Sequence, residues 1–101
     1  MFVLMVELEA VPELAGELEQ LLHELVEIAA HEPGVHFYAA QRDREHAARF
    51  MLCEFYADQL AWQAHLVNAP VHARLKHFER LLAVPPRVVQ CDALAATPWR
   101  V

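Results

Sequence analysis

The sequence has no serine and only two glycines, Gly16 and Gly34. A serine nucleophile is therefore excluded, and so is a glycine-rich loop of the kind that cradles nucleotide phosphates. Cysteine is almost as scarce, because Cys53 and Cys91 are the two thiols and they form no Cys-x-x-C spacing. Each lies in an apolar run, so we expect both thiols to be buried and reduced.

Positive charge is scarce as well. Eight Lys and Arg against fourteen Asp and Glu give a formal net charge of −6. The chain therefore has no stripe of basic residues that could bind a phosphate backbone, and we expect neither nucleic acid nor an anionic membrane as a partner. No Lys or Arg precedes Arg42, which excludes the charged start of a secretory signal. No apolar run approaches the roughly 20 residues that span a bilayer. We therefore expect a soluble, cytoplasmic protein.

The length predicts one domain, because the chain has 101 residues and a typical domain has about 100–150. Hydrophobic residues make up 56% of it, above the usual proportion of about 45–50%. A domain this small buries only about two-thirds of the surface of its unfolded chain, so surplus apolar residues belong in a subunit interface. The composition therefore predicts a homo-oligomer.

Apolar runs predict four strands, over residues 2–10, 35–41, 49–56 and 87–94. The charged segment 42–46 suits a hairpin loop between the second strand and the third. The fourth strand closes a single domain of residues 1–94. Residues 95–101 are left as a C-terminal tail, and we expect its Trp99 to pack on a partner chain.

Apolar residues at helical spacing predict the helices. The longest helix starts at Pro12, where the missing N–H costs nothing, and stops at Pro33-Gly34. Asp58 can cap a short helix that runs through residues 60–67, and Asn68-Ala69-Pro70 separates it from another helix that ends at Pro85-Pro86. The apolar face of this last helix comprises Val71, Leu75, Phe78 and Leu82.

The resulting order, β-α-β-β-α-α-β, is the split β-α-β pattern of a ferredoxin-like α+β domain with its last helix divided in two. Helices would then cover one face of an antiparallel sheet. The third strand is apolar on both faces, with Phe50, Leu52 and Tyr56 alternating with Met51, Cys53 and Phe55. One helical layer cannot cover both. We therefore expect two copies to pack sheet against sheet, as a homodimer with a barrel-like centre.

His65 and Trp62 lie three residues apart on the short helix, so they share a face. An imidazole titrates near neutrality and can take a proton or hydrogen-bond a developing anion, while an indole offers a flat wall to an aromatic substrate. The two residues are therefore candidates for a pocket between helix and sheet. The alternative, which is the more common situation, is a Trp in the core beside a hydrogen-bonded His.

Glu54 occupies an interior position of the third strand, so its carboxylate must be paired or protonated if it is buried. A structural ion pair with Arg74, Arg80 or Arg87, or a structural hydrogen bond, is the simplest explanation, and a catalytic role is the alternative. Tyr38 and Tyr56 carry hydroxyls at the ends of apolar walls, where they could orient a polar group of a substrate. Ordinary amphipathic packing explains both tyrosines as well.

A stripe of alternating carboxylates and imidazoles follows the long helix, formed by Glu19, His23, Glu27 and His31. The spacing is one that metal sites use. However, the stripe lies opposite the leucine face, contains no Cys and lacks the H-E-x-x-H pattern. We predict a solvated ladder and no metal site.

Three short motifs stand out, namely EPGVHFY at residues 32–38, FMLCEFYAD at residues 50–58, and Trp62 and His65 followed by NAPVH at residues 68–72. Together they resemble the antibiotic biosynthesis monooxygenase domain family. The resemblance covers roughly residues 2–94. It implies a dimeric α+β barrel and a monooxygenase that oxidises a small aromatic, such as a phenol, quinol or anthrone, with molecular oxygen and no metal, flavin or haem.

The resemblance also implies roles for individual residues. His65 and Glu54 match the family's His and Glu in the E-x-[WY]-x-[DS]…H stretch, which makes them the candidate catalytic residues. Trp62 would be a pocket wall, Tyr56 stands where Trp is common, and the remaining candidates for substrate binding are Tyr38, Asn68 and His72. A substrate deprotonated to a phenolate or carbanion can itself reduce oxygen, so the protein need supply only a base, hydrogen bonds and a dry pocket.

Other activities stay open, because a fold does not fix a reaction. A non-enzymatic dimer that binds a small ligand, as in a stress response, is one alternative, and an isomerase that uses the same His without oxygen is another. Haem-degrading relatives use an axial His with a supporting Asn and Trp. Trp62 with His72 or His77 imitates that set loosely, but the first strand has no Asn, so we disfavour this branch.

Overall fold

The structure, a computed structural model, describes residues 1–98; the prediction for Trp99 lies outside them. Within this range the strands are β1 (Phe2–Glu9), β2 (Val35–Arg42), β3 (Arg49–Tyr56) and β4 (Arg87–Asp92). The helices are a 3-10 turn η1 (Pro12–Leu14), α1 (Ala15–Ala29), α2 (Gln59–Val67), α3 (Ala69–Leu75) and α4 (Phe78–Leu81). None of the helices in the described part is long and apolar enough to cross a bilayer.

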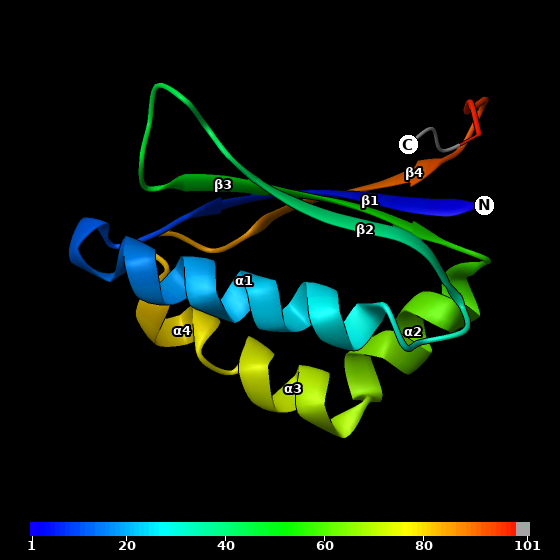
Figure 1. Cartoon of the computed structure of the whole chain (residues 1–101), viewed down its shortest axis with the longest axis horizontal. Helices are drawn as coiled ribbons and strands as arrows, with labels where there is room; N and C mark the ends of the chain where they lie inside the picture. The colour runs from blue at the N-terminus through cyan, green and yellow to red at the C-terminus, as the bar shows by residue number, and fades with distance from the viewer. Residues whose placement is uncertain (99–101) are drawn as a thin grey trace.

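The strands form one antiparallel sheet in the order β2-β3-β1-β4. All the helices lie on the same side of this sheet (Figure 1). The arrangement confirms the predicted ferredoxin-like α+β fold, in which β1 and β3 are central and β2 and β4 are edge strands.

The helix expected between Pro70 and Pro85 is wrong as a single element, because the structure divides it into α3 and α4 near His77. The division brings the chain back to the end of β1. There the N–H of Val11 donates to the carbonyl of Leu81 at 2.9 Å, and Ala10 pairs with Leu82 in an isolated bridge. The fourth strand also ends earlier than expected, at Asp92.

The core lies between the sheet and α1. Alternate side chains of β1 and β3 face the helices and are buried, as the sequence predicted. They pack against the leucine face of α1, and the buried set includes Leu4, Leu8, Phe50, Leu52, Tyr56, Leu18, Leu22 and Leu25. The apolar residues that recur every second position in the strands and every 3.6 positions in the helix therefore pack together in one layer.

The outer face of the sheet carries no helix (Figure 1). Met5, Met51 and Val89 are exposed there by 46%, 41% and 39%. Cys53 and Cys91 are free thiols that are only partly buried, so the expectation of full burial is wrong for this chain on its own. Burial still raises the pKa of the Cys53 thiol, which favours its protonated form.

Gly34 marks the closest approach of α2 to the turn after α1. A methyl group on Gly34 would lie 2.6 Å from the side-chain carbon of Ala61, a distance that non-bonded carbons do not tolerate. By contrast, nothing lies within 4 Å of a methyl group placed on Gly16, in the first turn of α1.

Substitution of the two glycines should therefore have opposite effects on stability. Gly34→Ala should lower the free energy of unfolding by about 1–3 kcal/mol, because α2 or the start of β2 must move. Gly16→Ala, the matched control, should leave it unchanged or raise it by up to about 1 kcal/mol. Urea unfolding followed by circular dichroism measures both changes. Equal effects would show that the contact with Ala61 is not a constraint.

Candidate active site

The helix α2 carries the candidate base. Asp58 caps this helix, since its carboxylate accepts a hydrogen bond from the N–H of Ala61 at 2.8 Å, as the sequence predicted. Two turns later His65 lies on the face of α2 that turns toward the sheet, and only 3% of it is exposed. A histidine buried to this degree needs a hydrogen-bond partner.

That partner is Glu32, in the turn between α1 and β2. The Oε1 atom of Glu32 lies 2.6 Å from Nδ1 of His65, and its Oε2 atom accepts a hydrogen bond from the side-chain amide of Asn68 at 3.3 Å. A carboxylate only accepts hydrogen bonds, so Nδ1 of His65 carries the proton and donates it. The lone pair of the neutral imidazole is then on Nε2, which makes no hydrogen bond to another described residue.

Sequence reasoning missed Glu32 as a functional residue. Its only signal was its place at the start of the EPGVHFY motif, 33 positions before His65. Nothing in the spacing along the chain indicates that a turn after one helix will meet the inner face of another.

Two tyrosines flank the imidazole from the sheet. The ring centroids of Tyr38 on β2 and Tyr56 on β3 lie 5.5 Å and 5.7 Å from that of His65. The hydroxyl of Tyr56 donates a hydrogen bond of 2.5 Å to Oε1 of Glu54. The structure thus gathers His65, Tyr38, Tyr56, Glu54 and Asn68 into one cluster between the sheet and the helices.

Of the two structural explanations for Glu54, the hydrogen bond is confirmed and the ion pair with an arginine is wrong. Each of the three candidate arginines binds a different carboxylate, with Arg74 on Glu24, Arg80 on Glu17 and Arg87 near Glu7. These pairs lie on the helical surface and at the edge of the sheet, whereas Glu54 is 4% exposed. The strand geometry explains the difference, because Glu54 faces the interior layer, where its partner is the Tyr56 hydroxyl.

Burial without a cation changes the protonation of this cluster. Desolvation raises the pKa of Glu54 to about 7, and the hydrogen bond from Tyr56 only partly opposes it. Burial, and then the nearby Glu54 carboxylate, raise the pKa of Tyr38 and of Tyr56 above the ordinary range. Both tyrosines are therefore neutral hydrogen-bond donors, and Glu54 can exchange a proton near neutrality.

Two predicted site residues lie elsewhere. The ring of Trp62 packs on Phe2, with centroids 5.3 Å apart, at the end of β1. His72 is exposed on α3 and makes no side-chain hydrogen bond within the described part of the chain. The structure therefore does not bring His72 to the cluster, and Trp62 forms part of the packing at the end of the sheet.

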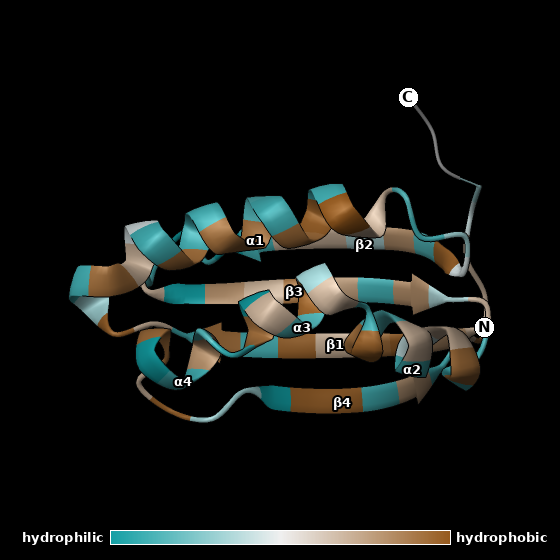
Figure 2. Cartoon of the chain, turned by 90° about the horizontal axis from the view of Figure 1, so that it is seen from below, coloured by the Kyte–Doolittle hydropathy of each residue, from teal (hydrophilic) through white to brown (hydrophobic). Residues whose placement is uncertain are grey.

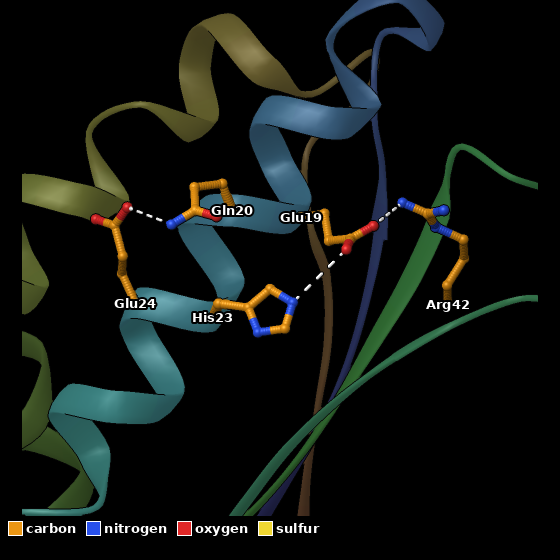
Figure 3. Close-up of polar contacts among 5 residues, drawn as sticks. All are labelled: Glu19, Gln20, His23, Glu24 and Arg42. Carbon is orange, nitrogen blue, oxygen red and sulfur yellow. Dashed lines mark hydrogen bonds and ion pairs between the residues drawn. The ribbon is translucent and has the colours of Figure 1, made fainter.

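The stripe on α1 is solvated, as predicted. His23 lies 3.6 Å from Glu19, and these side chains are 68% and 49% exposed (Figure 3). Glu19 also bonds Arg42 on β2. Within residues 1–98, no group of three or more His, Cys, Asp or Glu side chains is arranged to hold a metal ion.

A hollow of about 350 Å³ reaches the dyad of Glu32 and His65 from the molecular surface. Its walls are formed by the turn after α1 and by α2, with His31, Gly34, Ala64 and Asn68 around the dyad. Both members of the dyad line this hollow, and Glu32 is the more exposed of the two, at 15% against 3% for His65.

The fold and the buried ionisable cluster define a small ferredoxin-like α+β protein with a polar site between sheet and helices. The sequence model for antibiotic biosynthesis monooxygenases matches residues 1–80. The chain belongs to the antibiotic biosynthesis monooxygenase family.

Solved structures agree on the fold. The chain is 26% identical to PA3566 from Pseudomonas aeruginosa, with a TM-score of 0.86 over 93% of this chain and 94% of that one. It is 27% identical to NE2512 from Nitrosomonas europaea, described as a protein of unknown function, with a TM-score of 0.85 over 98% and 94%. A crystal structure described as an antibiotic biosynthesis monooxygenase is 22% identical, with a TM-score of 0.88 over 94% and 100%. No curated protein matches the chain.

The buried carboxyl group of Glu54 should make stability depend on pH. Because its pKa in the folded chain is about 7 and its ordinary value is 4.5, the folded chain holds this proton more tightly than the unfolded one. The stabilisation is complete below the ordinary value and is lost as the pH rises through about 7. From about pH 5 to about pH 8, the free energy of unfolding of the wild type should fall by on the order of 2 kcal/mol more than that of Glu54→Gln.

Chemical denaturation at a series of pH values measures this difference. Glutamine keeps the acceptor for Tyr56 and removes the titration, so other ionisable groups affect both proteins equally. Parallel pH profiles for the two proteins would show that Glu54 does not titrate near neutrality.

Proposed function

We propose that this protein is a cofactor-independent monooxygenase that oxidises a small aromatic phenol or quinol with molecular oxygen. The observation that carries the proposal is the contact of Glu32 with Nδ1 of His65, which leaves Nε2 of a buried imidazole without a hydrogen-bond partner among residues 1–98. Family membership supports the reaction class. The buried site supports it as well, since a phenolate shielded from water is a stronger electron donor to oxygen.

In this mechanism His65 is the general base. Its Nε2 atom takes the proton of the substrate hydroxyl, and the resulting imidazolium is stabilised by the Glu32 carboxylate on Nδ1. Glu32 is thus a positioning residue, because it fixes the tautomer and the orientation of the ring. Asn68 holds the second oxygen of Glu32 in place.

The phenolate then supplies the electrons that reduce oxygen. Oxygen adds to an unsubstituted ring carbon to give a peroxide, and loss of water from this peroxide leaves a quinone. For a naphthol, one naphthol and one O₂ give one naphthoquinone and one water, and one quinone oxygen comes from O₂. The proton on His65 leaves with that water.

The tyrosines and Glu54 form the remaining polar wall in this proposal. Tyr38 is a neutral donor that can bind the developing phenolate or peroxide oxygen, whereas Tyr56 donates its one proton to Glu54 and lines the wall beside it. Glu54 holds Tyr56 and can return a proton near neutrality. Trp62 contributes packing beside the site rather than a substrate contact.

The functional unit we propose is a homodimer formed through the outer face of the sheet. Met5, Met51, Phe55 and Val89 give this face an apolar surface that no helix covers. Sheet-to-sheet packing of two copies would remove it from water. The same packing would bury the half-exposed thiols of Cys53 and Cys91.

Oxygen consumption by the metal-stripped protein tests the reaction with a panel of naphthols and hydroquinones. His65→Ala should lower kcat/KM by about a hundredfold to ten-thousandfold, the usual contribution of a general base. Glu32→Gln should lower kcat and leave KM nearly unchanged, because it acts through the imidazole. His46→Ala, in the exposed hairpin loop, is the matched control and should retain full activity.

Labelled oxygen separates this reaction from simple oxidation, because one labelled atom should appear in the quinone. Absence of uptake throughout the panel would contradict the proposal and favour a dimer that only binds a ligand. Turnover that continues without oxygen would favour an isomerase. Uptake that ignores His65→Ala would retain the activity and refute the site.

Light scattering during size-exclusion chromatography tests the dimer. The wild type should elute with the mass of two chains, and Met5→Glu should elute as a monomer because it places a charge at the centre of the apolar face. Leu60→Glu changes a more exposed apolar residue on α2, at 73% against 46% for Met5, and should remain a dimer. A wild-type monomer, or a dimer that tolerates Met5→Glu, would contradict this interface.

A further inference from the structure

A second hollow, of about 510 Å³, lies between α1 and the edge strand β2. Figure 2 shows α1 running alongside β2, on the helical side of the sheet. The hollow exists because Ala40 gives the inner face of β2 a small side chain there, while Leu22 and Val26 reach over from α1. Its volume is within the range of about 300–1,000 Å³ that small-molecule sites occupy.

The chemistry of this groove is apolar along its floor and polar at its ends. Leu22, Val26, Ala40 and Phe50 line the floor. Tyr38 and Arg42 stand on the same face of β2, four residues apart, so their Cα atoms are separated by about 13 Å. A flat apolar molecule with one polar group at each end fits such a site.

Tyr38 connects the groove to the candidate active site. Its side chain lines the groove, and its ring lies 5.5 Å from that of His65. Tyr38 is partly buried, and its hydroxyl makes no hydrogen bond within residues 1–98. A substrate hydroxyl at this end would meet the Tyr38 hydroxyl, whose ring lies beside the imidazole.

Arg42 provides a cation at the opposite end. Its guanidinium carbon lies 4.9 Å from the centroid of the Phe50 ring, so the cation rests on the floor of the groove. Glu19 of α1 pairs with it across the mouth and also faces His23 (Figure 3). The side chains of Arg42 and Glu19 are 43% and 49% exposed, and an ion pair this exposed adds little net stability. A carboxylate on a ligand can therefore replace Glu19 at small cost.

We propose that the groove between α1 and β2 binds a fused-ring phenol that carries a carboxylate, with the phenol at Tyr38 and the carboxylate on Arg42. The two rings lie on the apolar floor, and Phe50 supplies the aromatic surface beneath them. The inference rests on the proposed function, because it names the substrate class of that site. It also assigns Arg42 as the residue that determines specificity.

Calorimetric titration under nitrogen tests binding without turnover. The two probes are a hydroxynaphthoate and the naphthol that lacks its carboxylate. The wild type should bind the hydroxynaphthoate about tenfold more tightly. Arg42→Gln should abolish this preference and leave the affinity for the naphthol unchanged, whereas Arg44→Gln, in the neighbouring loop outside the groove, should retain it.

Two further variants locate the ligand. Glu19→Gln removes the competing carboxylate, so it should strengthen binding of the hydroxynaphthoate and leave binding of the naphthol unchanged. Ala40→Leu fills the floor of the groove and should weaken both ligands by at least about tenfold. Circular dichroism of each variant confirms that it is folded.

The proposal is overturned if the wild type binds neither probe, if it binds both equally, or if the preference survives Arg42→Gln. Full affinity of Ala40→Leu for both ligands would also overturn it, since the ligand would then lie elsewhere. The titration separates this inference from the reaction. A carboxylate preference without oxygen uptake refutes the monooxygenase alone, and oxygen uptake without the preference refutes only the role of Arg42.

Discussion

The alternation of side chains along β3 is the constraint on which the site depends. Phe50, Leu52 and Tyr56 must face the helices to complete the core, and a strand has a period of two. Glu54 lies between Leu52 and Tyr56 on the same face, so the fold buries a carboxyl group with no cation near it. The raised pKa of Glu54 and the hydrogen bond from Tyr56 both follow from this forced position.

A second constraint acts from the helical layer. The absence of a side chain at Gly34 lets α2 approach the turn after α1, and this approach joins Glu32 to His65. Residues from two helices, a turn and two strands therefore surround one imidazole. Burying a histidine destabilises the fold unless its ring nitrogen has a hydrogen-bond partner. The Glu32 carboxylate provides that partner, and it also sets the tautomer of His65. Structural stability and the proposed basicity of Nε2 have the same origin.

The two faces of the sheet differ in what they carry. The inner face, with the helices, encloses the ionisable cluster and the groove toward Arg42. The outer face keeps an apolar surface around Met5 and Val89. Relatives at 22–27% identity share the fold. Because a fold does not fix a reaction, the chemistry depends on the few side chains that line the inner layer.

The sequence by itself determined the strands, the long helix, the capped start of α2 and the ferredoxin-like order, since each depends on local periodicity or on a neighbouring cap. It also indicated His65, Tyr38, Tyr56 and Asn68 as candidates. Only the tertiary structure decided that α3 and α4 are separate, that Glu32 binds His65, and that Arg74, Arg80 and Arg87 bind carboxylates other than Glu54. The reason is physical: these contacts join residues far apart in the chain, and their partners are chosen by how the helices pack on the sheet, which no local pattern encodes.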